Sequence, residues 1–172
     1  MGHVIIDTNV PLKAADLCPI DEIDRKCSAA CLQFISQLIH SSDTIVLDAG
    51  GEILNEYRRN INMAASDNAA TVYLKWVLRK QLLGNADLIN ITKIGNNSYK
   101  EFPASPGLKN FDPSDRKFVA LAKAHPHHPP IINGSDTDWW ISREALQSEG
   151  VQVVFLCEEY MKERSKGKKK EK

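Results

Sequence analysis

The chain has 172 residues, of which 42% are hydrophobic and 26% charged, with 22 basic and 22 acidic side chains. This length and balance predict one soluble globular domain with a substantial core. No apolar run approaches the roughly 20 residues that span a bilayer, and the first residues lack the pattern of a signal peptide or a myristoylation site. We therefore expect a cytoplasmic protein that does not act at a membrane.

Charge is distributed unevenly along the chain. Residues 162–172 hold seven basic and two acidic side chains, so this segment carries +5 and residues 1–161 carry −5. We interpret residues 1–161 as the domain and residues 162–172 as a basic, disordered tail. A basic tail on an acidic body could alternatively bind a polyanion.

Cysteine and histidine offer two places where a soft metal could bind. Cys27 and Cys31 are one helical turn apart, but the four cysteines (Cys18, Cys27, Cys31 and Cys157) include no CxxC pair. We expect buried, reduced thiols instead. The histidines of residues 125–128 alternate with prolines, which favours an extended loop with solvated side chains over a metal site.

The elements alternate between strands and helices. Val4-Ile5-Ile6 is a continuous apolar run, which is typical of a strand buried on both faces. Further strands are predicted at 44–47, 87–94, 131–132 and 151–156, and helices at 28–39, 52–61, 67–83, 112–124, 139–148 and from 158 onward. Residues 16–26 and 95–111 are predicted loops. This order indicates an α/β fold with a mostly parallel sheet of five strands covered on both faces.

Acidic residues follow strands or open helices at four places. Asp7 and Asp136 end the first and fourth strands, Asp115 opens a helix, and the helix after the second strand offers Glu52 and Glu56. Ligands of parallel α/β sheets bind beyond the carboxyl ends of the strands. Carboxylates gathered there are costly unless a cation neutralises them, and Mg²⁺ or Mn²⁺ with oxygen ligands can drive phosphodiester hydrolysis.

Helical geometry separates the two glutamates. At about 100° per residue, Glu56 lies about 115° from the centre of the apolar face and Glu52 about 155°. Glu56 is therefore preferred, and Glu52 remains a candidate. Each acid also has a plain structural interpretation: Asp7 as a turn residue, Asp115 as a helix-dipole acid, and Asp138 as a helix cap.

Several residues near these acids could contact a nucleic acid. The candidates for phosphate contacts, chosen by nearness in sequence, are Arg58, Arg59, Lys100, Lys109, Arg116 and Lys117; each could equally be a solvated surface charge. The aromatic residues of the 95–111 segment are Tyr99, Phe102 and Phe111. They could stack on unpaired bases or pack the loop against the domain.

The ordered motifs resemble the PIN-domain family of nucleases. They are Ile5-Ile6-Asp7-Thr8-Asn9, then Glu56-Tyr57, then Asp112-Pro113-Ser114-Asp115 with Ala120 and Ala122, and finally Ser135-Asp136-Thr137-Asp138-Trp139. Together they run from residue 4 to about 156. The resemblance implies a doubly wound, three-layer α/β/α sandwich.

It also implies an Mg²⁺ or Mn²⁺ site of Asp7, Glu56, Asp115 and Asp136, with Asp138 as an additional acid. Thr8 and Asn9 would shape the loop after the first strand, and Ser135 would support Asp136. Members are typically ribonucleases specific for single-stranded RNA, including toxins of toxin–antitoxin pairs. Others act in RNA processing or on DNA.

Our working hypothesis is a metal-dependent endoribonuclease with RNA favoured over DNA as substrate. An antitoxin partner and a homodimer are both compatible with it. Aspartyl-phosphate chemistry is a weaker alternative, because it needs a second aspartate where this chain has Asn9. A non-catalytic RNA- or protein-binding module on the same scaffold is the other, although such a module would have no reason to keep all four acids.

Overall fold

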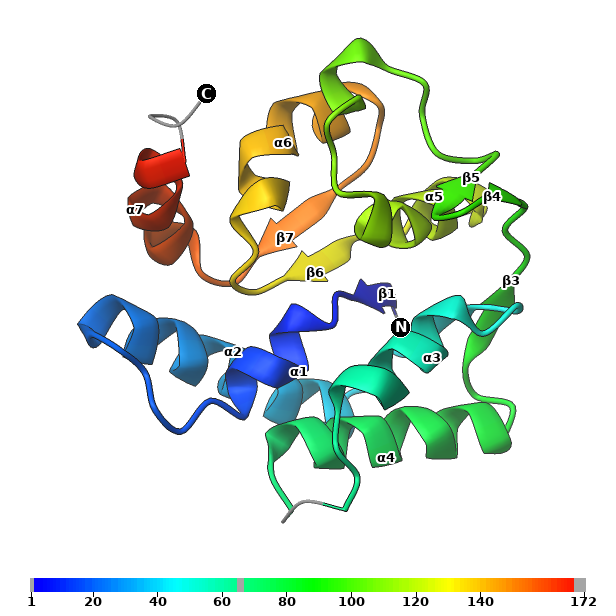
Figure 1. The fold of residues 1–172 in the computed structure, drawn as a ribbon. Coiled ribbons are helices and arrows are strands. Elements are labelled where there is room, and N and C mark those ends of the chain that lie inside the picture. Colours follow the sequence, from blue (N-terminus) through cyan, green and yellow to red (C-terminus); the bar gives the residue numbers. More distant parts are fainter. Residues whose placement is uncertain (1, 65–66, 169–172) are drawn as a thin grey trace.

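Five parallel strands form the centre of the molecule. The computed structural model describes residues 2–64 and 67–168. Its central sheet has the order β3-β2-β1-β6-β7, and every neighbouring pair is parallel (Figure 1). The strands are β1 (His3–Ile6), β2 (Thr44–Asp48), β3 (Asp87–Ile89), β6 (Ile131–Asn133) and β7 (Val153–Phe155). The predicted five-stranded parallel sheet is confirmed.

Helices cover both faces of this sheet. They are α1 (Asn9–Ala14), α2 (Glu22–His40), α3 (Glu52–Asn60), α4 (Ala69–Leu82), α5 (Arg116–Ala124), α6 (Thr137–Ser148) and α7 (Glu158–Lys168). In Figure 1, α5 and α6 lie on one side of the strands and α2 and α4 on the other. The predicted α/β/α sandwich is therefore confirmed as the fold class.

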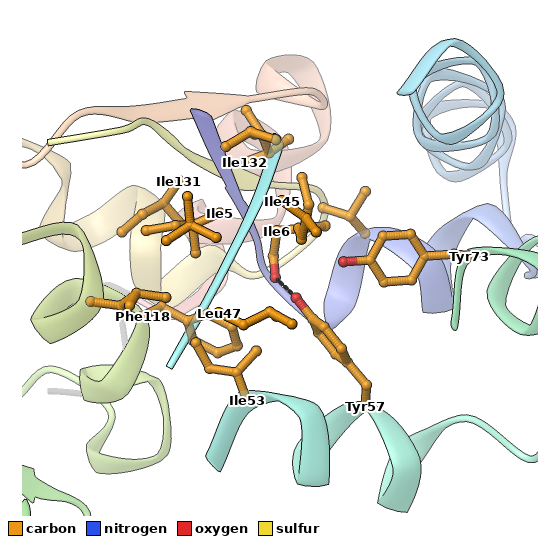
Figure 2. Packing of buried hydrophobic residues seen from close by; sticks show 14 of the residues in the cluster. Ile5, Ile6, Ile45, Leu47, Ile53, Tyr57, Tyr73, Phe118, Ile131 and Ile132 are labelled. Carbon is orange, nitrogen blue, oxygen red and sulfur yellow. Dashed lines mark hydrogen bonds between the residues drawn. The ribbon is translucent and has the colours of Figure 1, made fainter. Parts of the chain in front are cut away.

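The middle strand is buried as its composition predicts. Ile5 and Ile6 are fully buried and pair in register with Ile131 and Ile132 of β6. Burial of such a side chain stabilises the fold by about 1.5–3 kcal/mol. Figure 2 shows Tyr57 of α3 reaching this strand, where its hydroxyl donates to the carbonyl oxygen of Ile6 at 2.5 Å. The helix that carries Glu56 is thus attached directly to β1.

The winding of the chain reverses at β1. From β1 the chain proceeds outward to β2 and β3, and it then returns to the other side of β1 to form β6 and β7. The carboxyl ends of β1 and β6 therefore form the switch point at which open α/β sheets bind ligands. The backbone N–H of Asp7 donates to the Ile132 carbonyl at 3.0 Å, so Asp7 lies directly beside the end of β6.

Both predicted loops contain regular structure. Helix α2 begins at Glu22, because the Asp21 side chain caps it by accepting the backbone N–H of Asp24 at 2.8 Å. The loop prediction for residues 16–26 is therefore wrong from Glu22 onward. The 95–111 segment contains strand β5 (Ser98–Tyr99), which pairs with β4 (Lys93–Gly95), and a short 3₁₀ turn, Pro106–Leu108.

The aromatic side chains of that segment mostly face inward. Tyr99 is 4% exposed and Phe111 is 2% exposed, and the rings of Phe102 and Phe111 stack with their centroids 6.0 Å apart. Tyr99 and Phe111 therefore pack the segment against the domain. The alternative, in which these two rings stack on bases, does not fit the structure.

The first seven residues of the predicted disordered tail are helical. Helix α7 continues through Lys168, and Arg164 forms an ion pair with Asp21 at the start of α2. Residues 162–168 are thus helical rather than disordered, because this ion pair and the buried Met161 attach the helix to the domain. The remaining tail residues, 169–172, lie outside the described part of the chain.

The cysteine prediction is wrong for three of the four residues. Cys27 of α2 and Cys157, next to α7, form a disulfide, and Cys18 is exposed. Cys31 is a buried free thiol as predicted. Disulfides persist mainly in oxidising compartments, so this bond weighs against the cytoplasmic location, which stays a prediction. Within the described ranges no helix is long and apolar enough to cross a membrane.

The disulfide joins residues 130 positions apart, so its reduction should lower stability. In the chain-entropy model a loop of this length corresponds to about 5 kcal/mol. We expect reductant to lower the free energy of unfolding, measured by urea denaturation, by about 2–5 kcal/mol. The control variant Cys18→Ser should leave the free energy of unfolding unchanged in both the oxidised and the reduced protein. Equal stability of oxidised and reduced wild type would contradict the structural role of the disulfide.

Candidate metal centre

Four carboxylates meet at the switch point of the sheet. Asp7 follows β1, Glu56 lies in α3, Asp115 immediately precedes α5, and Asp136 immediately precedes α6. The charges of the other three all raise the pKa of Asp7, which places the four in one electrostatic environment. We call Asp7, Glu56, Asp115 and Asp136 the acid cluster. It contains the four acids predicted from the sequence as metal ligands.

Asp7 lies deepest in the cluster. Its side chain accepts the backbone N–H of Asn9 at 3.0 Å and the side-chain amide of Asn133 at 3.3 Å. Burial is the largest influence and raises its pKa well above the ordinary value, and the charge of Asp115 adds to this effect. The Asn9 hydrogen bond opposes the shift only in part, so a buried negative charge at Asp7 is costly.

Asp115 also has a raised pKa. Burial, followed by the charges of Asp136 and Asp112, raises its pKa to about 7, although the Lys117 ammonium opposes the shift. The indole N–H of Trp139 donates to its carboxylate at 2.9 Å. Trp139 is fully buried, so it holds the Asp115 side chain in a fixed orientation. In the sequence Trp139 stands out only as part of a motif, because its contact with Asp115 joins residues 24 positions apart.

The two residues after Asp7 connect the other segments of the cluster. Thr8 donates its hydroxyl to Glu56 Oε1 at 2.5 Å. Asn9 Oδ1 accepts the backbone N–H groups of Gly134 and Ser135, at 2.7 and 3.2 Å. Thr8 and Asn9 are predicted to shape the loop after the first strand; in the structure they also link that loop to Glu56 and to the segment before Asp136. Ser135 contributes through its backbone to the loop that carries Asp136.

Asn133 is a member of the site that the sequence analysis missed. It ends β6 and is fully buried. Its amide nitrogen contacts Asp7, and its Oδ1 has no hydrogen-bond partner among the described residues. A polar residue directly after two isoleucines was the available signal. The carboxylates of the acid cluster form a hard, all-oxygen donor set, which fits Mg²⁺ or Mn²⁺.

Asp136 and Asp138 differ from the predicted arrangement. Asp136 caps helix α6 by accepting the backbone N–H of Asp138 at 2.9 Å. The suggestion that Asp138 itself caps this helix is therefore wrong. Asp138 is absent from the main charges acting on Asp7 and Asp115, and it lines a separate hollow with Phe111 and Ile141. The role of Asp138 as an additional acid of the metal site stays a prediction.

Local structure also decides between the two glutamates. Asp48 starts helix α3 by accepting the backbone N–H groups of Glu52 and Ile53, both at 2.8 Å. Glu52 then forms an ion pair with Lys93 at 2.8 Å and is not among the main influences on Asp7 or Asp115. Glu56, one turn later, is among them. The geometry favours Glu56, as helical spacing predicts.

The predicted phosphate contacts divide into buried and exposed residues. Lys117 is 4% exposed and pairs with Glu56, so its interpretation as a surface phosphate contact is wrong. Arg116 donates to the carbonyl oxygens of Lys109 and Phe111, both at 3.4 Å, and therefore attaches the 95–111 segment. The other candidates are exposed; they are Arg58, Arg59, Lys100 and Lys109.

In the described part of the chain, three potential ligand atoms all lie within 4.8 Å of one another at two places, and the acid cluster is not one of them. Cys27, Cys31 and Cys157 contain the disulfide. His125 joins His3 and Asp87 at the opposite edge of the sheet, and it is buried rather than solvated.

The tautomer of His125 argues against metal binding at this second cluster. Its Nδ1 accepts the His127 backbone N–H at 3.0 Å. A neutral ring therefore carries its proton on Nε2, which lies 2.9 Å from Asp87. That nitrogen is a hydrogen-bond donor to Asp87 and has no lone pair for a metal.

Comparisons with family models, with curated proteins and with solved structures found no match for this chain.

The raised pKa values predict that the metal-free protein loses stability as pH rises. In the unfolded chain Asp115 has the ordinary aspartate pKa of 3.8, and in the folded protein its pKa is about 7. The folded state therefore binds the proton more tightly than the unfolded chain does. The free energy of unfolding should decrease as the pH rises between these two pKa values, by on the order of 4 kcal/mol at most. Thermal unfolding in EDTA from pH 4 to 7 should show this decrease.

The matching variant is Asp115→Asn, which removes the titrating group. This variant should show a smaller decrease in stability with rising pH. Mn²⁺ at pH 7 should raise the thermal stability of wild type but not that of the variant. A wild-type protein in EDTA that becomes more stable over this pH range would contradict the assignment.

Proposed function

We propose that this protein is a PIN-like nuclease dependent on Mg²⁺ or Mn²⁺, and specifically an endoribonuclease that hydrolyses single-stranded RNA. The observation that supports the proposal is the acid cluster at the switch point. Asp7 and Asp115 are buried there among further carboxylates, and both have raised pKa values. A divalent cation is the partner that offsets such a concentration of negative charge.

The residues of the chain have distinct tasks in this proposal. Asp7, Asp115 and Asp136 would hold the cation, and the amide nitrogen of Asn133 donates to the Asp7 carboxylate. Trp139 orients Asp115, and Asn9 holds the loop that carries Asp136. When bound, the cation would polarise the phosphodiester and favour attack by water. The positions of the carboxylates would be set before substrate arrives, which reduces the cost of reorganisation.

The surface near the cluster suits a polyanion. Arg58 and Arg59 are exposed in the last turn of α3, two and three residues after Glu56. Lys100 and Lys109 are exposed on the segment that Arg116 holds beside Asp115. Basic side chains of this kind bind phosphates without reading sequence. The preference for RNA over DNA, an antitoxin partner, a homodimer and a cytoplasmic location come from the sequence analysis and remain proposals.

Cleavage of labelled single-stranded RNA and DNA, with Mn²⁺ or with EDTA, tests this function. We expect wild type to cut RNA internally in Mn²⁺ and to be inactive in EDTA. Asp7→Asn should lower the rate at least about a hundredfold, because metal-ion stabilisation contributes several kcal/mol to phosphodiester hydrolysis. The folded state should persist, since asparagine keeps the shape of the side chain.

Glu52→Gln is the matched control on the same helix as Glu56. Its carboxylate pairs with Lys93 at the surface, so the variant should cleave RNA at nearly the wild-type rate. Cleavage that survives both EDTA and Asp7→Asn would overturn the metal mechanism. Preferential cleavage of DNA would show that the substrate is DNA and not RNA. Binding of nucleic acid without any cleavage would show that the protein is a binding module and not an enzyme.

A further inference from the structure

A lysine lies buried inside the acid cluster. Lys117 is 4% exposed, which is rare for this residue type unless it is paired. It is in the first turn of α5, two residues after Asp115. Its ammonium forms an ion pair with Glu56 Oε2 and donates a hydrogen bond to the Ser114 carbonyl oxygen. The cluster therefore already contains one positive charge supplied by the chain.

This ammonium is located on the glutamate side of the cluster. Glu56 Oε1 accepts the Thr8 hydroxyl at 2.5 Å, and Glu56 Oε2 faces Lys117. Both oxygens of this carboxylate are thus engaged by groups of the chain. Its side chain is only 16% exposed and that of Lys117 6%, so water screens the pair little and its charges largely neutralise each other.

The Lys117 ammonium also acts on Asp115, but it is not among the main influences on Asp7. The main charges acting on Asp7 are those of Asp115, Asp136 and Glu56, all negative. A divalent ion is therefore attracted most strongly beside Asp7. A second ion would need Glu56 as a ligand and would lie close to the Lys117 ammonium. Two cations at such a separation in a buried site repel strongly.

We infer that Lys117 is a built-in cation that fills the Glu56 side of the acid cluster and limits the centre to one divalent ion, held by the aspartates. The inference rests on the proposed metal centre and adds the number of ions that it binds. Lys117 is then a positioning residue: it holds Glu56 and does not contact substrate.

Counting bound Mn²⁺ tests this inference, by equilibrium dialysis and by electron paramagnetic resonance of the free ion. The full chain is used without nucleic acid. Wild type should bind one ion per chain. Lys117→Met removes the ammonium and leaves Glu56 available, so this variant should bind two. The double variant Lys117→Met with Glu56→Gln should return to one, because the second ion loses its ligand.

Two variants control for charge and for general effects of substitution. Lys117→Arg keeps the positive charge and should bind one ion. Lys123→Met changes a lysine on the same helix whose ammonium donates to the Glu149 carbonyl at 2.9 Å, and it should also bind one. Circular dichroism checks the fold. If Lys117→Met does not fold, Lys117→Gln provides the same test, because it keeps a donor for Glu56 without the charge.

Each outcome separates this inference from the proposed function. Two ions in wild type, or one ion in folded Lys117→Met or Lys117→Gln, would overturn the inference, while metal-dependent RNA cleavage would still stand. No ion in any protein would overturn the metal centre and the inference together. One ion in wild type, two in the neutral variants and one in the double variant would support it.

Discussion

The repulsion among buried carboxylates is the constraint on which the rest of this structure depends. Asp7 and Asp115 are both buried beside other acids, and burial is the largest cause of their raised pKa values. Such a site is tolerated only where the surrounding groups hold it together. Trp139 holds Asp115, Asn133 contacts Asp7, and Lys117 pairs with Glu56. The fold thus gives up stability to keep negative charge at one edge of the sheet.

The central strand links that edge to the hydrophobic core. Ile5 and Ile6 are fully buried, and the next three residues, Asp7 to Asn9, contact two other segments of the cluster: α3, and the end of β6 with the loop after it. The hydrogen bond from Tyr57 to the Ile6 carbonyl joins α3 to the same strand, as Figure 2 shows. Because side-chain packing in a core resists displacement, it fixes the positions of the polar groups just beyond it. Core packing and site geometry therefore depend on each other here.

Prediction from sequence succeeded where a single local rule applied. Continuous apolar runs identified buried parallel strands, and helical spacing alone preferred Glu56 over Glu52. Prediction was wrong where the outcome depended on a distant partner. The predicted disorder from residue 162 overlooked the ion pair between Arg164 and Asp21, and the predicted reduced thiols overlooked that Cys27 and Cys157 meet across 130 residues.

The sequence by itself determined the alternation of strands and helices, the burial of β1 and the position of Asp7 directly after that strand, since these follow from local periodicity and side-chain chemistry. Tertiary structure alone decided which groups meet. Lys117 reads as a surface charge in the sequence, and Asn133 as a strand end. Lys117 is buried against Glu56, and Asn133 against Asp7, only when α3, α5 and β6 pack around β1. These contacts join segments that are far apart along the chain.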